Sequence, residues 1–347
     1  MEDFTKYIID KNATIKEALM QLDKLSNDVL TLFVVDGKQM EGTLTDGDIR
    51  RALIRNVPLD ASIEQVMNKS FKYIYPHEKD IQKIREIKAS GVQLLPCLRE
   101  NGELLKIYNL KEKKSILPVD AVLMAGGKGL RLRPLTEKTP KPLLKVGEKT
   151  IIDYNIDSLI DYGVENIHVT TNYLAEQLEQ HFSKERQGVK INCVRENEYL
   201  GTIASVKLIS SINNDDVLVM NSDLFTNIDF EDFYRHFMEN KADMSAAAIL
   251  YPINVPYGIF ELDGRIIQGI KEKPVYNYYA NAGIYLLKKS LFDLIPDGVY
   301  FNATDLMALL ISCGKTVVRY PLVGYWIDIG KLEDFQKARD FVKHISF

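Results

Sequence analysis

Residues 117–143 combine an apolar run, a glycine cluster and several cations at a spacing suited to binding a polyanion. The run ends in Ala-Gly-Gly-Lys-Gly, which predicts a buried strand followed by a loop without Cβ atoms, where backbone N–H groups can approach a ligand closely. The nearby cations favour a triphosphate over an ordinary glycine turn before a basic surface loop. The residues concerned are Gly126, Gly127, Gly129, Lys128, Arg131 and Lys141.

Two aspartates occupy positions suited to a magnesium ion. An apolar run over 217–220 predicts a strand that delivers Asp223 at its carboxyl end, where open α/β sheets bind ligands. Asp328 lies in a second short apolar segment, Trp-Ile-Asp-Ile-Gly. Mg²⁺ needs only one or two carboxylates besides phosphate oxygens and waters, so two separated aspartates suffice. Taken alone, each aspartate is more often a helix cap or a turn residue.

The elements that would position these residues alternate along the chain after Pro118, as in a mostly parallel sheet covered by helices. A hairpin over 258–262 and 265–270, with an Asp-Gly turn, is expected as an antiparallel insertion on the substrate side. The predicted strands are 121–124, 167–170, 190–194 and 217–220, and the predicted helices are 151–162, 174–182, 203–208, 230–237 and 332–343.

The segment before Lys114 contains an internal repeat of helix, strand, turn and strand. Neither copy can bury its own apolar face, so the two copies predict a pseudo-symmetric pair. A charged linker over 111–118 separates this segment from the rest, which predicts domains at 1–115 and 119–347. The first copy has a helix from Ile15, a strand at 30–35, a second strand and a helix at 49–54, and the second has a helix at 81–90 and strands at 92–98 and 104–108.

Composition narrows the functional class. With 347 residues and 46% hydrophobic content the chain can bury more than one core, and a net charge of −4 predicts no nucleic-acid partner. No 18-residue apolar run and no signal peptide are evident, which predicts a cytoplasmic protein without a membrane partner. Cys97, Cys193 and Cys313 are scattered and read as small buried hydrophobes in a reducing compartment.

The segment Leu-Met-Ala-Gly-Gly-Lys-Gly-Leu-Arg-Leu-Arg-Pro-Leu-Thr, followed by Pro-Lys-Pro-Leu, resembles the signature of the sugar-1-phosphate nucleotidyltransferases. The likeness runs from about Val119 to the C-terminus, with Leu130 at a position that is usually Thr. It implies an α/β fold with a Rossmann-like mixed sheet of the GT-A type. It also implies transfer of a nucleotidyl group from an NTP to a sugar-1-phosphate, with release of pyrophosphate.

The chemistry of that transfer fits the residues present. The attacking phosphate is already anionic, so the site must supply positioning, charge neutralisation and a divalent cation rather than a nucleophile. The chain accordingly shows no Ser/His/Asp arrangement. By the resemblance, Arg131, Lys141 and Lys128 are catalytic, and Asp223 and Asp328 hold Mg²⁺.

The resemblance extends to both substrates. Glu-Lys-Pro at 272–274, Asn-Ala-Gly at 281–283 and Tyr-Gly at 257–258 match sugar-phosphate elements of the family, and Leu-Gly-Thr at 200–202 matches a base and ribose loop, although Ile203-Ala204 replaces the usual Ala-Gly. The implied sugar-phosphate residues are Tyr257, Gly258, Glu272, Lys273 and Asn281, and the implied nucleotide-binding residues are Leu123, Ala125, Gly126, Gly127, Gly129, Gly201 and Thr202.

The N-terminal repeat resembles tandem cystathionine-β-synthase (CBS) domains, the Bateman module, through Val-Val-Asp at 34–36 and Gly-Thr-Leu-Thr-Asp-Gly-Asp at 42–48. In that family the residues matching Thr45 and Asp48 contact an adenine nucleotide, whereas here they could simply cap a helix. The second copy has Tyr108-Asn109-Leu110-Lys111 in place of Thr-x-x-Asp, so at most one complete nucleotide cleft is expected. The module is also expected to form a homodimer or higher homo-oligomer.

The combination of both parts most resembles the glucosamine-1-phosphate guanylyltransferases that supply legionaminic acid synthesis. It implies GTP and glucosamine-1-phosphate as substrates. Guanylyl transfer to mannose- or heptose-1-phosphate, and uridylyl, thymidylyl or cytidylyl transfer, remain open. A different class, a non-catalytic nucleotide sensor with a degenerate transferase fold, is disfavoured by the complete set of cations and aspartates.

Overall fold

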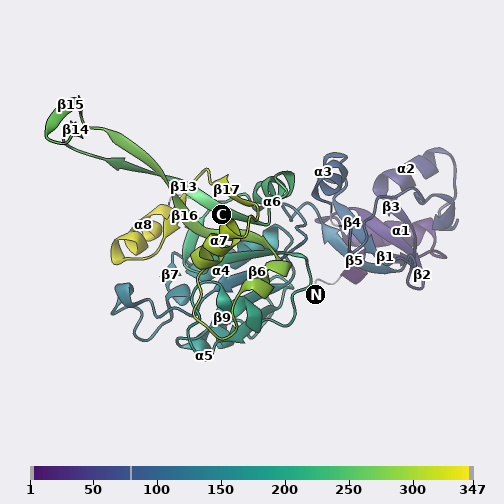
Figure 1. Cartoon of the computed structure of the whole chain (residues 1–347). Coiled ribbons are helices and arrows are strands. Elements are labelled where there is room, and N and C mark those ends of the chain that lie inside the picture. Colours follow the sequence, from purple (N-terminus) through teal and green to yellow (C-terminus); the bar gives the residue numbers. More distant parts are fainter. Residues whose placement is uncertain (1–3, 79, 344–347) are drawn as a thin grey trace. The chain divides into compact units, whose positions relative to one another are not determined.

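The computed structural model describes residues 4–78 and 80–343, which form two compact units. One unit comprises residues up to Pro118 together with 160–163, and the other comprises 119–159 and everything from Val164 onward. No helix within the described residues is long and apolar enough to cross a lipid bilayer. Figure 1 shows the element order along the chain.

The first unit contains both copies of the sequence repeat. In the first copy, β1 pairs in parallel with β2 and β2 pairs antiparallel with β3. The second copy repeats this arrangement, because Ile74 bridges Cys97 in parallel and β4 pairs antiparallel with β5. The copies meet where the Met40 N–H donates to the Gly102 carbonyl, at 3.1 Å. The elements are β1 (Ile8–Asp10), α1 (Ile15–Lys24), β2 (Thr31–Asp36), β3 (Gln39–Thr45), α2 (Asp46–Ile54), α3 (Ile81–Ala89), β4 (Leu94–Leu98) and β5 (Leu104–Asn109).

The two copies differ at their ends. In the first, α2 follows β3 directly and buries Ile49 and Ala52 in the core of that copy. In the second, β5 ends at Asn109 and a turn leads toward Pro118 without a helix. The second copy therefore lacks the helix that a Thr-x-x-Asp sequence would begin.

The second unit is built on a sheet whose order is β10-β9-β6-β11-β16-β13-β17. All neighbouring strands are parallel except at β16, which runs opposite to β11 and β13. The predicted α/β fold with a mostly parallel sheet is confirmed. The strands are β6 (Val119–Met124), β9 (Ile167–Thr171), β10 (Ile191–Arg195), β11 (Asp216–Asn221), β13 (Met244–Asn254), β16 (Val275–Lys288) and β17 (Val317–Pro321).

Helices cover this sheet, and three short pairs of strands, β7–β8, β12–β18 and β14–β15, form separate two-stranded sheets. The helix predicted over 203–208 is present as a 3-10 helix, Ala204–Leu208, and the N–H groups of Ile203 and Ala204 donate to the Phe301 carbonyl. The remaining elements are α4 (Ile151–Asp161), α5 (Ala175–His181), α6 (Phe230–Glu239), α7 (Ala303–Ser312), α8 (Leu332–Val342), β7 (Lys145–Val146), β8 (Lys149–Thr150), β12 (Leu224–Thr226), β14 (Ile259–Asp263), β15 (Ile266–Lys271) and β18 (Trp326–Asp328).

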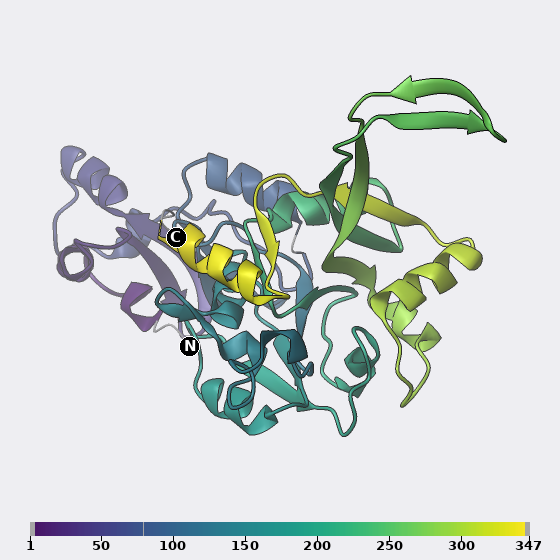
Figure 2. The same ribbon diagram turned by 90° about the vertical axis from the view of Figure 1, so that its left-hand side faces the viewer.

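A long two-stranded arm leaves this sheet, visible at the upper left of Figure 1 and the upper right of Figure 2. It continues β13 and β16 and carries the predicted hairpin, β14 and β15, at its tip. The sequence pattern gave no sign of the outer halves of β13 and β16. The prediction of buried cysteines holds for Cys97, whereas Cys193 is half-buried and Cys313 is exposed at the end of α7.

Candidate active site

The loop after β6 is closed in by side chains from three other segments. A Cβ at Gly126 would lie 2.8 Å from Glu196 Oε1, and one at Gly129 would lie 3.1 Å from both Thr136 and Lys141. Gly129 also has a φ of +59°, which favours glycine. Gly126 and Gly129 are thus required for a tight, bare backbone beside Glu196 and Lys141, whereas a Cβ at Gly127 would meet nothing within 4 Å.

Two short strands bring the predicted metal ligands together. Asp223 follows β11 and precedes β12, and β12 pairs antiparallel with β18 so that Leu224 lies opposite Asp328. The Ile329 N–H donates to the Asp223 carbonyl at 3.2 Å. The ribbon therefore holds both carboxylates side by side at the carboxyl edge of the parallel strands.

Lys141 lies between these carboxylates. Its Nζ donates to Asp223 Oδ2 and lies 4.0 Å from Asp328 Oδ1, while only 11% of its side chain is exposed. Burial and the neighbouring Asp223 raise the pKa of Asp328, and Lys141 and Arg131 oppose that rise. The Oδ1 atom of Asp223 is buried and has no hydrogen-bond partner among the described residues.

Arg131 approaches the same ribbon from the loop after β6. Its guanidinium lies beside Gly330: a Cβ at that glycine would be 3.5 Å from Arg131 Nη2. Lys128 is exposed and forms no hydrogen bond or ion pair within the described part of the chain. The structure thus brings Arg131, Lys141, Asp223 and Asp328 into one cluster, with Lys128 on the open loop beside it.

This donor set fits a divalent cation. Two carboxylates lie around Lys141 Nζ, and one of them keeps a buried oxygen that has no hydrogen-bond partner among the described residues. Residues 4–78 and 80–343 contain no group of three or more His, Cys, Asp or Glu side chains that could enclose a metal. A cation bound here would therefore complete its shell with phosphate oxygens and water, as Mg²⁺ commonly does.

Glu196 lies beside the glycine loop and was not among the residues expected from the sequence. Its side chain lies against Gly126, it is only 2% exposed, and its Oε1 has no hydrogen-bond partner within the described residues. Burial raises the pKa of this carboxyl, while the Leu200 N–H, which donates to Oε2 at 3.1 Å, and the nearby hydroxyls of Thr170 and Ser205 oppose the rise. The only sequence signal was an acidic residue two positions after the predicted strand 190–194.

The Leu-Gly-Thr loop is fastened to the start of α7. A Cβ at Gly201 would lie 2.6 Å from the Phe301 carbonyl oxygen, so no larger residue fits without a shift. Thr202 Oγ1 accepts a hydrogen bond from the Ala303 N–H at 3.0 Å. The hydroxyl of Thr202 thus has a structural partner, and the loop is held beside Glu196 by the Leu200 N–H. Leu123 and Ala125 are buried in β6 and the residue after it, where only their backbone could meet a base.

Of the residues expected to bind the sugar phosphate, Asn281 alone lies at the catalytic edge. It stands where β16 leaves the sheet, one residue from Ala282, whose carbonyl accepts a hydrogen bond from Trp326 Nε1 at 2.9 Å. Its own amide binds Tyr285 Oη and the Gly283 N–H. The other four are Tyr257, Gly258, Glu272 and Lys273, which lie on the outer part of the arm.

Comparison with known proteins identifies the family. Residues 120–344 match the Nucleotidyl transferase family, and residues 4–55 match the CBS domain. The chain belongs to the nucleotidyl transferase family.

Three similar proteins illustrate the range of relatives. A putative mannose-1-phosphate guanyltransferase of Sulfolobus acidocaldarius is 34% identical over 223 residues, which cover 63% of this chain and 62% of that protein. Bifunctional protein GlmU of Methanococcus maripaludis is 31% identical over 233 residues, covering 64% and 54%. The crystal structure of HddC from Yersinia pseudotuberculosis has a TM-score of 0.52 and 26% identity, covering 65% of this chain and 99% of that one. The chain thus spans less than two thirds of either curated relative.

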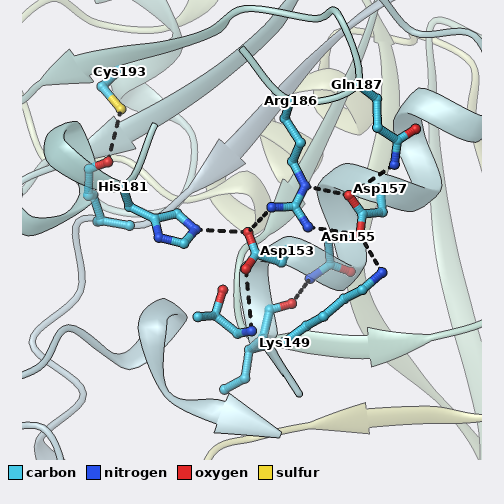
Figure 3. A network of polar contacts seen from close by, with 11 residues as sticks. Lys149, Asp153, Asn155, Asp157, His181, Arg186, Gln187 and Cys193 are labelled. Carbon is cyan, nitrogen blue, oxygen red and sulfur yellow. Dashed lines mark hydrogen bonds and ion pairs between the residues drawn. The ribbon is translucent and has the colours of Figure 1, made fainter. Parts of the chain in front are cut away.

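A second group of charged residues in the nucleotidyl transferase domain is completely paired (Figure 3). Asp157 binds Arg186 and Lys149, and Asp153 binds His181 Nε2 at 2.8 Å and Arg186 Nη1 at 3.0 Å. Burial alone would raise the pKa of both aspartates, but their partners outweigh it and lower both values. This network joins α4 to the end of α5 and the segment after it. Its carboxylates are occupied by Lys149, His181 and Arg186, so they are not available to a ligand.

In the CBS domain, Thr45 and Asp48 form a capping box at the start of α2. The Thr45 N–H and hydroxyl donate to Asp48 Oδ2 at 2.9 and 2.6 Å, and the Asp48 N–H donates back to Thr45 Oγ1 at 3.2 Å. Arg51 pairs with the other oxygen of Asp48 at 2.5 Å. The helix-cap role considered from the sequence is therefore present in the structure.

Proposed function

We propose that this chain transfers a guanylyl group from GTP to a sugar-1-phosphate and releases pyrophosphate. The observation that carries the choice of base is the Oε1 of Glu196 beside Gly126, which has no hydrogen-bond partner among residues 4–78 and 80–343. Guanine presents two adjacent N–H donors on one edge, and a carboxylate is an acceptor-only group that can receive both. Uracil and thymine present one such donor beside two carbonyl acceptors, which a carboxylate repels. The name of the Sulfolobus relative also supports guanine.

In this proposal the backbone N–H groups of Gly126, Gly127 and Gly129 hold the phosphates, and Lys128 and Arg131 neutralise the departing pyrophosphate. An oxygen of the sugar phosphate attacks the α-phosphorus as the bond to the β-phosphate oxygen breaks. Lys141 holds the α-phosphate between both reactants.

Asp223 and Asp328 would hold Mg²⁺ in this proposal, and the ion would supply charge stabilisation to the phosphates when bound. Lys141 Nζ, which donates to Asp223 Oδ2 and lies 4.0 Å from Asp328 Oδ1, would contact the α-phosphate beside the two aspartates.

For the acceptor we propose glucosamine-1-phosphate, on the resemblance of the combined CBS and transferase chain to enzymes that supply legionaminic acid synthesis. Mannose-1-phosphate is the second candidate, favoured by the names of the Sulfolobus and Yarrowia relatives. Tyr257, Gly258, Glu272, Lys273 and Asn281 would contact the sugar phosphate in either case.

Pyrophosphate release from GTP, ATP, UTP and CTP, each with glucosamine-, mannose- and heptose-1-phosphate, tests the proposal. We expect the highest kcat/KM for GTP with glucosamine-1-phosphate. A preference for UTP or CTP would overturn the assignment of Glu196, and no release with any pair would favour a nucleotide sensor.

For the CBS domain we propose homodimerisation and binding of an adenine or guanine nucleotide near Thr45 and Asp48. A regulatory effect requires that the nucleotide bind two states of the protein unequally. Calorimetry of the full chain with AMP, which lacks the triphosphate of the substrate, tests this directly. If AMP binding released or absorbed no heat, Thr45 and Asp48 would serve only as a helix cap, and the domain would act only in assembly.

A further inference from the structure

The arm is the feature of the molecule that the chemistry described so far leaves unexplained. We define it as residues 248–281, which continue β13 and β16 beyond the sheet and carry β14 and β15 (Figures 1 and 2). Its two strands pair without a register shift from Ala248 and Asn281 to Asn254 and Val275. The arm is therefore a regular ribbon over this length, and its strands are interrupted only further out, at residues 255–258 and 272–274.

The arm begins at the catalytic edge and leads away from it. Gly283, just before its root, has a φ of +72° and lies so close to Asn221 that a Cβ would be 2.5 Å from that amide. From Asn281 to Val275 the strand covers six residue steps, about 20 Å at the rise of an extended strand. Glu272 and Lys273 lie still further out, beyond the reach of the Asp223 and Asp328 cluster of their own chain.

One face of the arm is apolar and uncovered. Tyr251 pairs with Tyr278, and Ile253 pairs with Tyr276, so these four side chains share a face. Their exposed fractions are 57%, 56%, 44% and 38%. The opposite face is partly covered near the root, where the Arg319 guanidinium lies 4.0 Å from the centre of the Tyr279 ring. A two-stranded ribbon is marginal in water unless such a face is packed.

The exposed area is sufficient for a stable contact. At roughly 100 Å² for each half-exposed large side chain, the four residues of this face and four apolar residues of the tip present about 800 Å². A standard interface buries about 800 Å² on each partner. The tip residues that contribute are Phe260, Leu262, Ile267 and Ile270.

Charge also permits association of two arms or of an arm with another copy. The arm contains three acidic and three basic residues, so it has no net charge that would repel a second copy. Lys271 and Glu261 already pair within the tip, at 2.5 Å. Among the described residues, what remains without an ion pair at the tip is mainly apolar surface, together with Asp263, Arg265, Glu272 and Lys273.

We propose that the arm packs its apolar face on a second copy of this chain and brings Glu272 and Lys273 to the Asp223 and Asp328 cluster of that copy. This inference rests on the proposed function, in which these two residues bind the sugar phosphate. In a closed two-fold dimer the exchange is reciprocal. Each active site then contains the nucleotide loop of one chain and the arm of its partner.

Mixed dimers test the exchange. Asp223→Asn and Lys273→Ala chains are co-expressed with different tags, and the dimers are assayed for pyrophosphate release after purification through both tags. With exchanged arms, one of the two sites contains an intact cluster and an intact arm. We expect activity in about half of the sites of these mixed dimers, although each variant alone is defective.

The matched control combines Asp223→Asn with Asp328→Asn, which alter the same cluster and should give no activity in a mixed dimer under either arrangement. If the Asp223→Asn and Lys273→Ala mixture is as inactive as this control, the arm serves its own chain and the exchange is wrong. If Lys273→Ala alone keeps normal affinity for sugar phosphate, the proposed sugar site fails and the exchange fails with it.

The apolar face is tested independently by the mass of the full chain in solution. Tyr251→Glu combined with Tyr278→Glu should shift the protein toward a smaller assembly in analytical ultracentrifugation. The control is Ile311→Glu on α7, a residue that is 61% exposed and lies outside the arm, and it should leave the mass unchanged. An unchanged mass for the double arm variant would exclude this face as the contact.

Discussion

Two groups of carboxylates in the nucleotidyl transferase domain have opposite surroundings. Asp153 and Asp157 are bound by arginine, lysine and histidine, and these partners lower the pKa of both in spite of burial. At the catalytic edge, burial raises the pKa values of Glu196 and Asp328. Carboxylates that hold the fold together are neutralised within the chain. Those that retain unpaired oxygens and raised pKa values are suited to binding a ligand.

The largest expected effect separates these groups most clearly. Asp223→Asn and Asp328→Asn should each abolish turnover, because each removes a negative charge that would hold a divalent cation beside the triphosphate. Pyrophosphate release measured over a range of Mg²⁺ concentrations, with circular dichroism to check folding, tests this. Near-normal Mg²⁺-dependent rates in both variants would exclude the metal assignment. If only one variant lost activity, the other aspartate would position the metal ligand and would not bind the ion itself.

Arg131→Ala should have the next largest effect. The guanidinium lies beside Gly330, so its removal should cost about 2.7–4 kcal/mol of transition-state stabilisation, the range for one donor of this kind. The measurement is kcat under saturating substrates. A change confined to the KM for sugar phosphate would indicate that Arg131 contacts the sugar phosphate and not the NTP.

Glu196→Gln should change the choice of nucleotide. Loss of a charged acceptor for two guanine donors should weaken GTP binding by about 1.5–3 kcal/mol, which raises its KM by roughly 10- to 150-fold. Glu198→Gln is the matched control, since Glu198 is exposed two residues away and should leave the KM for GTP unchanged. Equal KM values for GTP in both variants would remove Glu196 from the base site.

Glu196 also shows where sequence reasoning was sufficient and where it was not. Glycine spacing and the family signature located the loop after β6 and both aspartates, because these depend on local backbone needs and on strand ends. Glu196 was missed because its importance comes from Gly126, 70 positions away in sequence, which only the packed sheet reveals. The arm was missed for a related reason. Its outer strands bury neither face in this chain, so they show no alternation of polar and apolar residues.

The pH dependence of GTP binding should reveal the same carboxyl. The pKa of Glu196 is raised above its usual value, so its carboxylate is lost at a higher pH than an ordinary glutamate would be. GTP affinity should therefore fall as pH decreases through that raised pKa and stay constant above it. Asp328 titrates in the same direction, so the informative quantity is the difference between wild type and Glu196→Gln. Identical profiles for the two proteins would show that Glu196 does not titrate against the base.

The smallest expected effect on catalysis, and the sharpest contrast, comes from Asp157→Asn. Its native pKa is lowered, so the ionised form stabilises the fold, and this contribution disappears only in acid as pH falls through the native pKa. At neutral pH the substitution should reduce the free energy of unfolding by about 1–2 kcal/mol, less than for a fully buried pair because Lys149 and Arg186 retain solvent contact. Thermal denaturation measures this loss, and kcat should not change.

Asp328→Asn should have the opposite effects on stability and turnover. The native pKa of Asp328 is raised, so neutralising it at pH 7 should leave the melting temperature unchanged or higher while turnover disappears. If Asp157→Asn lowered kcat without lowering stability, the paired network would belong to the catalytic machinery and the distinction between the two groups would fail.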